Sequence, residues 1–151
     1  MTKTKSPVVM PALALRGLTI FPNMLLHFDV GREASIKALD EAMATGQPIF
    51  LVAQKEIAVE TPRAEDLFSI GTISNIRQIL RLPGDNVRVM VEGVARGQLA
   101  GLSQTAPYLI AEVAEIEAGE SVRSSPRTEA LIRRTYDLFE TYSELAPRMT
   151  P

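Results

Sequence analysis

The chain has 151 residues, of which 46% are hydrophobic and 23% are charged, and its formal net charge is −2. This composition is typical of a soluble globular protein with one core, and the absence of cysteine excludes disulfides, a thiol nucleophile and thiolate metal sites. The negative net charge argues against a dedicated nucleic-acid binder. Because the sequence has neither a long apolar run nor a signal-peptide pattern, we expect a cytoplasmic protein without a membrane span.

The N-terminal part of the chain predicts short strands around a corner. Residues 1–7 are polar and are expected to be flexible. The β-rich segments that follow lie at residues 8–17, 18–21 and 25–30. Pro22 and Asn23 interrupt them, and proline cannot donate a hydrogen bond to a central ladder. We therefore expect these two residues to form a corner between two strands.

Residues 32–46 predict the helix with the clearest pattern. Ile36, Leu39 and Met43 fall on one apolar stripe, and charged residues occupy the other side. Gly46 stands where a left-handed C-terminal cap belongs. The sequence therefore predicts one helix inserted among the strands.

Further strands follow this helix. Residues 49–54 form a short continuous apolar run of the kind that is buried on both faces. A polar surface loop is expected next. The remaining β-rich segments are a hairpin of residues 72–82 and 87–97 around a turn at 83–86, and a last strand at 108–116. This strand-dominated order favours an antiparallel barrel or sandwich.

The two faces of the hairpin differ in composition. If residues 83–86 form a four-residue loop, Leu82 lies opposite Val87, and the face that carries Leu82/Val87, Leu80/Val89 and Gln78/Val91 points to the core. The predicted outer face has four pairs: Arg81 with Arg88, Ile79 with Met90, Arg77 with Glu92, and Asn75 with Val94. This face is either a half-exposed sheet surface with a few apolar residues or an adaptable binding patch, since methionine suits such patches.

The C-terminal part predicts a second helix. Ser125 is a suitable N-cap, Pro126 suits the first helical position, and the helix should end before Pro147. Its apolar stripe consists of Leu131, Ile132, Leu138, Phe139 and Tyr142. No compact element follows that could cover this stripe, so we expect a fragment of a longer chain.

Catalytic and cofactor-binding patterns are not found. No lysine follows a glycine, so a phosphate-binding loop is excluded. One histidine without cysteine does not suffice for a metal site, and His27 alone is more typical of a packed or surface residue than of a general base. Ser35 and Lys37 point apart on a helix. We expect no catalytic residues, no metal and no cofactor in this chain.

Four stretches together resemble the N-terminal domain of the Lon ATP-dependent proteases. They are "LRGLTIFPNMLLHFDVGREASIKALDEAM", "IFLVAQKE", "EDLFSIGTISNIRQILRLPGDNVRVMVEGVARG" and "PYLIAEV", and they cover most of residues 11–116. The chain departs from the family pattern at His27, where proline is usual, and at Ala14 and Gly17, where proline and an acidic residue are common.

The resemblance implies a mainly β (α+β) fold: a PUA-like antiparallel β-barrel at residues 8–120 with one inserted helix. Residues 121–151 would be a linker and the first helix of a truncated helical arm. The implied parent is a homohexamer with an AAA+ ATPase, which needs ATP and Mg, and a Ser-Lys protease domain. The implied role of this part is non-catalytic: it helps recognise unfolded or damaged proteins and deliver them to the rest of the protease.

Three hypotheses follow for the binding surface. In the first, an adaptable patch binds apolar segments of unfolded proteins through five residues: Met90, Ile79, Pro22, Met24 and Leu25. Three arginines would form its rim: Arg77, Arg81 and Arg88. In the second, the domain organises an oligomer through the C-terminal helix, at Leu131, Leu138 and Tyr142. RNA binding, the third, is disfavoured by the negative net charge and by an aromatic content of 5%.

Overall fold

A computed structural model describes residues 4–117 and 125–146 of the chain. The chain divides into two compact units, residues 1–118 and 119–151, which are described separately. The boundary expected at residues 120–121 lies outside the described residues, as do residues 1–3 of the expected flexible N-terminus. Thr4 bridges to Ile116 and the Lys5 amide donates to the Glu115 carbonyl at 2.9 Å.

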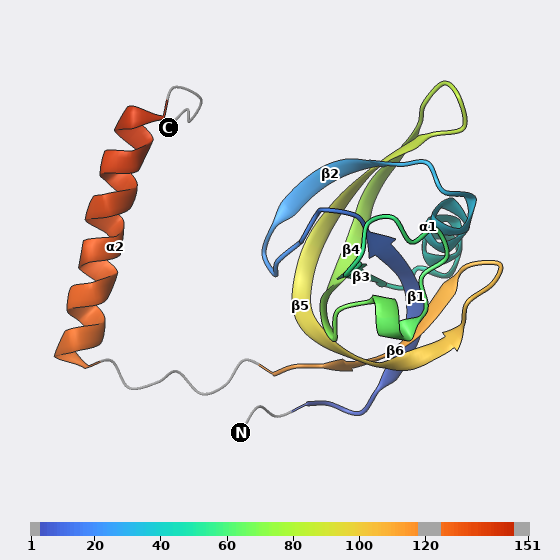
Figure 1. Ribbon diagram of the computed structural model, residues 1–151, viewed down its shortest axis with the longest axis horizontal. Coiled ribbons are helices and arrows are strands. Elements are labelled where there is room, and N and C mark those ends of the chain that lie inside the picture. The colour runs from blue at the N-terminus through green and yellow to red at the C-terminus, as the bar shows by residue number, and fades with distance from the viewer. Residues whose placement is uncertain (1–3, 118–124, 147–151) are drawn as a thin grey trace. The chain divides into compact units, whose positions relative to one another are not determined.

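The first unit is a six-stranded sheet that closes on itself (Figure 1). The strands are β1 (Val8–Leu15), β2 (Leu25–Val30), β3 (Ile49–Ala53), β4 (Ile70–Arg81), β5 (Val87–Gln104) and β6 (Leu109–Glu115). Their order is β2-β5-β4-β3-β1-β6, and a further pairing of β5 with β6 completes a ring of five strands. The ring is irregular but compatible with a barrel, so the predicted mainly β fold is confirmed. One pair, β1 with β3, is parallel.

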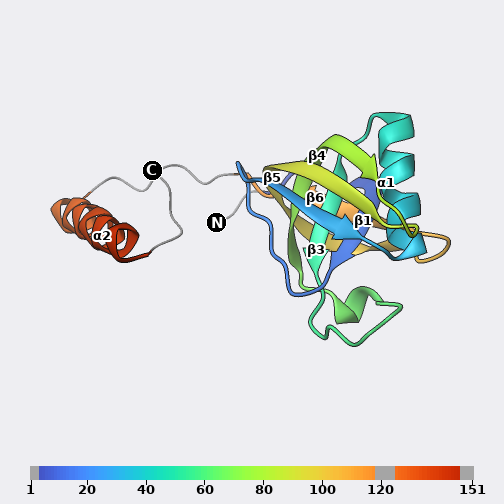
Figure 2. The ribbon, with the colours of Figure 1, turned by 90° about the horizontal axis from the view of Figure 1, so that it is seen from above.

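Helix α1 (Glu33–Thr45) packs against the ring at β1 (Figure 2). Its C-cap, Gly46, has a φ of 65°, which confirms the predicted left-handed cap. Leu39 is buried as expected and Ile36 packs against the core, whereas Met43 is exposed. The buried face instead includes two alanines, whose small side chains let the helix approach the strands closely.

The core fills both sides of β3. Ile49, Phe50, Leu51 and Val52 are all buried, which confirms the strand predicted to be covered on both faces. A second helix of a single turn, η1 (Ala64–Asp66), lies in the loop that follows. β3 therefore lies at the centre of the first unit.

The corner at Pro22 is a tight turn with a bulge. The Met24 amide donates to the Phe21 carbonyl at 3.2 Å, and Asn23 has a φ of 63°. Proline followed by a residue with positive φ is the pattern of a type II turn. The Asn23 amide donates to the Gly93 carbonyl at 2.8 Å and the Gly93 amide to the Met24 carbonyl at 2.9 Å. Two residues thus oppose one on β5, as in a G1 bulge.

The prediction of a strand at residues 18–21 is wrong. This segment has no regular secondary structure. Ile20 is buried, and its carbonyl accepts a hydrogen bond at 2.5 Å from the Thr72 hydroxyl of β4. A side chain therefore replaces the ladder partner that a strand would need.

The hairpin of β4 and β5 forms in a different register from the predicted one. Arg81 pairs with Val87 and Ile79 with Val89, so the connection has five residues instead of four. A one-residue slip turns side chains to the other face. Ile79 consequently packs in the core and Arg81 does not face Arg88. The predicted Arg77–Glu92 ion pair does form, although the register places Asn75 directly opposite Glu92 and leaves Arg77 at the irregularity between Ile76 and Gln78.

The second unit contains helix α2 (Pro126–Leu145). The Thr128 amide donates to the Ser125 hydroxyl at 3.2 Å, which confirms the predicted N-cap, and the helix ends before Pro147 as expected. Among the described residues, no helix is long and apolar enough to cross a membrane.

Gly93 provides a test of the corner. A Cβ at this position would lie 2.2 Å from the Phe21 oxygen and 3.2 Å from the Pro22 Cα, so the turn would have to move. We expect Gly93→Ala to lower the free energy of unfolding by about 1–3 kcal/mol, measured by urea denaturation. Gly101→Ala is the control, since nothing lies within 4 Å of its added Cβ. Equal stability of the two variants would contradict the close approach.

Candidate functional site

An apolar hollow lies beside the corner, and we call it the corner hollow. Its volume is about 390 Å³. The residues that line it include Leu15, Ile20, Phe21, Phe68, Ile70 and Arg96. The inner wall belongs to the core, whereas Phe21, Phe68 and Ile70 are exposed at the opening. Side chains from three separate segments thus form an apolar opening at the end of the ring.

The corner itself exposes further apolar side chains. Phe21 is 54% exposed, Met24 37% and Leu25 61%. Pro22 between them is partly buried against β5. Because the turn is hydrogen-bonded to Gly93 on both sides, these side chains are presented on a fixed backbone.

A second exposed surface, the outer face, is formed by β2 and β5. Leu25, His27 and Asp29 of β2 lie opposite Glu92, Met90 and Arg88 of β5. Directly opposed residues share a face of the sheet, so Met90 lies beside His27. The structure thus places Met90 and Leu25 on one surface, whereas Ile79 lies on the core side.

The arginines predicted for the rim are all paired. Arg77 contacts Glu92, Arg81 contacts Asp40 of α1 at 2.9 Å, and Arg88 contacts Asp29 at 2.6 Å. The hydrogen bond from Arg88 lowers the pKa of the Asp29 carboxyl and raises that of the guanidinium. On the outer face, apolar side chains therefore lie between charged side chains that form ion pairs.

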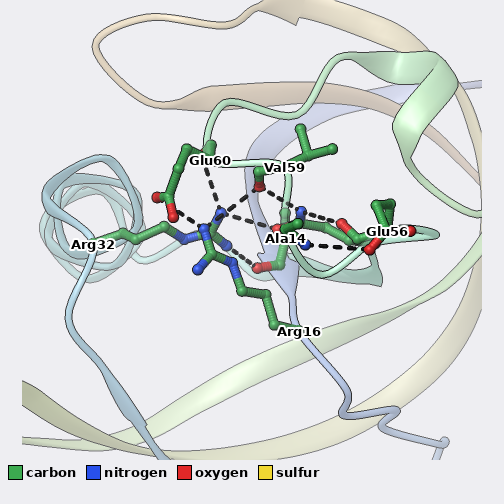
Figure 3. Close-up of polar contacts among 8 residues, drawn as sticks. Ala14, Arg16, Arg32, Glu56, Val59 and Glu60 are labelled. Atoms are coloured by element: carbon green, nitrogen blue, oxygen red, sulfur yellow. Dashed lines mark hydrogen bonds and ion pairs between the residues drawn. The ribbon is translucent and has the colours of Figure 1, made fainter.

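A polar network lies where β1 is not paired on one side (Figure 3). β1 pairs with β6 only as far as Ala12, while β3 continues along its other edge to Leu15. Arg32, next to α1, donates to the Ala14 carbonyl and, at 2.9 Å, to Oε1 of the buried Gln54. Its guanidinium therefore occupies part of the place of a missing strand.

The same network holds the loop after β3. Gln54 Nε2 donates to the Val59 carbonyl at 2.9 Å, and Arg16 pairs with Glu60 at 3.0 Å. Burial lowers the pKa of the Arg32 guanidinium, and the Arg16 charge lowers it further. The Arg16 hydrogen bond lowers the pKa of the Glu60 carboxyl. All these side-chain donors act on protein groups, so the network has a structural role.

Sequence reasoning missed three residues of the corner hollow: Phe21, Phe68 and Ile70. Phe68 and Ile70 stand at the end of a loop that was expected to be a polar surface segment. An aromatic residue within such a polar stretch was the available signal. Leu131, Leu138 and Tyr142, predicted as an oligomer contact, are exposed on α2 within their own unit.

Comparisons with known proteins place this fold among the substrate-binding domains of ATP-dependent proteases. The family model of the ATP-dependent protease La (LON) substrate-binding domain matches residues 9–151. The chain therefore belongs to the Lon substrate-binding domain family, which confirms the resemblance found in the sequence.

Curated relatives are much longer than this chain. The Lon protease of Clostridioides difficile is 44% identical over 151 residues, which are 98% of this chain and 19% of that protein. The Lon protease of Clostridium acetobutylicum is 44% identical over 142 residues, 94% of this chain and 18% of that protein. The chain thus spans about a fifth of the length of these relatives.

Two solved structures share the fold. The N-terminal domain of Mycobacterium avium complex Lon protease superposes with a TM-score of 0.67 at 19% identity, covering 91% of this chain and 68% of that one. The Lon N-terminal domain protein from Xanthomonas campestris gives a TM-score of 0.66 at 13% identity, covering 87% and 73%.

The Arg32 network yields a second prediction. Arg32→Lys keeps the charge but loses the planar fork, so Gln54 and the Ala14 carbonyl lose donors. We expect the free energy of unfolding to fall by about 1–3 kcal/mol, measured by urea denaturation. Arg16→Lys alters the pair with the exposed Glu60 and a 3.4 Å hydrogen bond to the Val59 carbonyl, and should cost less than about 1 kcal/mol. A larger loss in Arg16→Lys would reverse this assignment.

Proposed function

We propose that this chain is the non-catalytic substrate-recognition domain of a Lon-type protease and binds exposed apolar segments of unfolded or damaged proteins. The observation that carries the proposal is the set of exposed apolar side chains on a fixed turn, Phe21, Met24 and Leu25, beside the corner hollow. Apolar surface of this kind on a soluble domain is typical of an interaction site.

The chemistry of the surface fits a partner without fixed shape. An unfolded segment offers apolar side chains in varied order, so the receiving surface gains from adaptable groups such as Met24 and Met90. Burying one large apolar side chain contributes about 1.5–3 kcal/mol. Two or three such contacts support weak, reversible binding, which suits a domain that must also release its substrate.

The wider role rests on the longer relatives. We propose that the parent protein continues into an ATPase and a serine protease with a Ser-Lys dyad, forms a cytoplasmic homohexamer and uses ATP with Mg. This chain would then bring substrates to that assembly. The pairing of Arg77, Arg81 and Arg88 with carboxylates and the net charge of −2 give no reason to propose a nucleic-acid partner.

The apolar surface can be tested by binding. We expect Phe21→Ala, Met24→Ala and Met90→Ala each to weaken binding of a chemically denatured, fluorescently labelled protein by about three-fold or more, which corresponds to a loss of about 0.7 kcal/mol or more. Fluorescence anisotropy measures the affinity, and the same protein in its folded form should not bind. Val9→Ala is a control with a comparably exposed apolar residue on β1. If all three variants bind like the parent with their fold intact, the surface is misplaced.

A second candidate function is the organisation of an oligomer through α2. Apolar residues lie at intervals of three and four along the helix, and Leu131, Leu138, Tyr142 and Leu145 are exposed within their unit. Such spacing is typical of a helix that packs against another helix. We propose that this stripe contacts either further parts of a longer chain or other subunits.

Sedimentation equilibrium tests this role. If the stripe mediates self-association, Leu138→Ala combined with Tyr142→Ala should shift the molecule towards monomer at concentrations where the parent chain associates. Arg133→Ala combined with Arg134→Ala is a control on the same helix. Association that is unchanged by the apolar substitutions would rule out the stripe as the contact.

A further inference from the structure

β2 is an edge strand within the first unit. Among residues 4–117, it pairs with β5 and with no other strand. The sheet closes through β5 and β6, so β2 lies outside the closed ring of five strands (Figure 1). One side of β2 therefore presents unpaired main-chain groups.

The bulge at the corner determines which groups these are. Gly93 is hydrogen-bonded to Asn23 and Met24, and bonded and non-bonded pairs alternate along an antiparallel ladder. Leu26, Phe28 and Val30 consequently bond to β5. The N–H and C=O groups of Leu25, His27 and Asp29 point away from β5, and no partner for them is found in the described part of the chain.

The free edge borders a groove of about 430 Å³. The groove runs between β2 and the part of β1 that lacks a partner on this side. The residues that line it include Leu13, Leu15, Arg16, Leu18, Phe28 and Arg32. It is thus bounded by two strand edges and is mostly apolar.

The exposure of inward-facing residues shows where cover is missing. Leu26 and Phe28 of β2 point to the core side but remain half-exposed. Their partners across the ladder, Val91 and Val89, are fully buried at 0% exposure. The difference lies on the side of β2 that has no neighbouring strand.

Resting on the function proposed above, we infer that an extended segment of an unfolded polypeptide pairs with the free edge of β2 as an additional strand. The main chain of the segment would bond to Leu25, His27 and Asp29, and alternate side chains would cover Leu26 and Phe28. Strand addition of this kind takes its affinity from the main chain and tolerates varied sequences.

Charge indicates which segments fit best. Glu60 forms an ion pair with Arg16 and also interacts electrostatically with Arg32. Two guanidinium groups at the groove thus share one carboxylate, and the remaining positive charge favours an acidic side chain in the bound segment. A second copy of β2 would not supply one, because its only carboxylate, Asp29, is paired with Arg88.

The experiment compares three peptides on the unmodified chain. The parent peptide is a fluorescein-labelled sequence of alternating valine and polar residues with one glutamate. The other two have N-methyl groups on every second residue, one on the odd positions and one on the even positions. We expect one methylated peptide to bind at least ten-fold more weakly, because its methyl groups face β2, and the other to bind like the parent.

Variants and amide exchange locate the contact. His27→Pro removes an N–H that has no partner in the described part of the chain, and it should weaken peptide binding about ten-fold more than His27→Ala, which keeps this N–H. Circular dichroism checks the fold. Hydrogen exchange followed by NMR should show that the amides of Leu25, His27 and Asp29 exchange rapidly in the free chain. The same amides should exchange slowly when peptide is bound. If His27→Pro does not fold, the methylated peptides still decide.

The outcomes separate this inference from the proposed function. If denatured protein binds and the three peptides have the same affinity as one another, strand pairing is overturned. The proposed apolar binding surface would still stand. If neither denatured protein nor peptide binds, both are overturned. A concentration-dependent dimer that protects the same three amides would instead assign the edge to a second copy.

Discussion

The close contact between Gly93 and the Phe21–Met24 turn determines much of this domain. Because Gly93 has no Cβ, the chain can pass directly over β5 at this point and begin β2 as the neighbour of β5. The same contact places Phe21 at the corner hollow. It also determines which residues of β2 are hydrogen-bonded to β5 and which point away from it. The exposed apolar residues and the free edge therefore depend on one glycine and on the turn that Pro22 and Asn23 form.

The two candidate surfaces differ in what they recognise. The corner hollow and the outer face offer apolar contact, which depends on the side chains of a partner. The edge of β2 offers main-chain hydrogen bonds, which every extended polypeptide can make. A partner that uses both would be selected for being unfolded and apolar rather than for a particular sequence, which agrees with the recognition role proposed above.

The sequence predicted the elements of the fold better than their pairing. The corner was predictable because proline and asparagine have local preferences, and the buried β3 was predictable from its continuous apolar run. The hairpin register was not predictable, since the turn residues fit more than one connection length and nothing in the local sequence marks the irregularity between Ile76 and Gln78. The role of Arg32 was also hidden, because an arginine before a helix is ordinarily solvated.

The length of β5 has a mechanical consequence. This single strand of 18 residues is hydrogen-bonded to β4 along one edge, and to β2 and then β6 along the other. Tension along β5 would load all three ladders in shear, so their hydrogen bonds would have to break together rather than one after another. The ring should therefore resist deformation while a bound chain is pulled away from it.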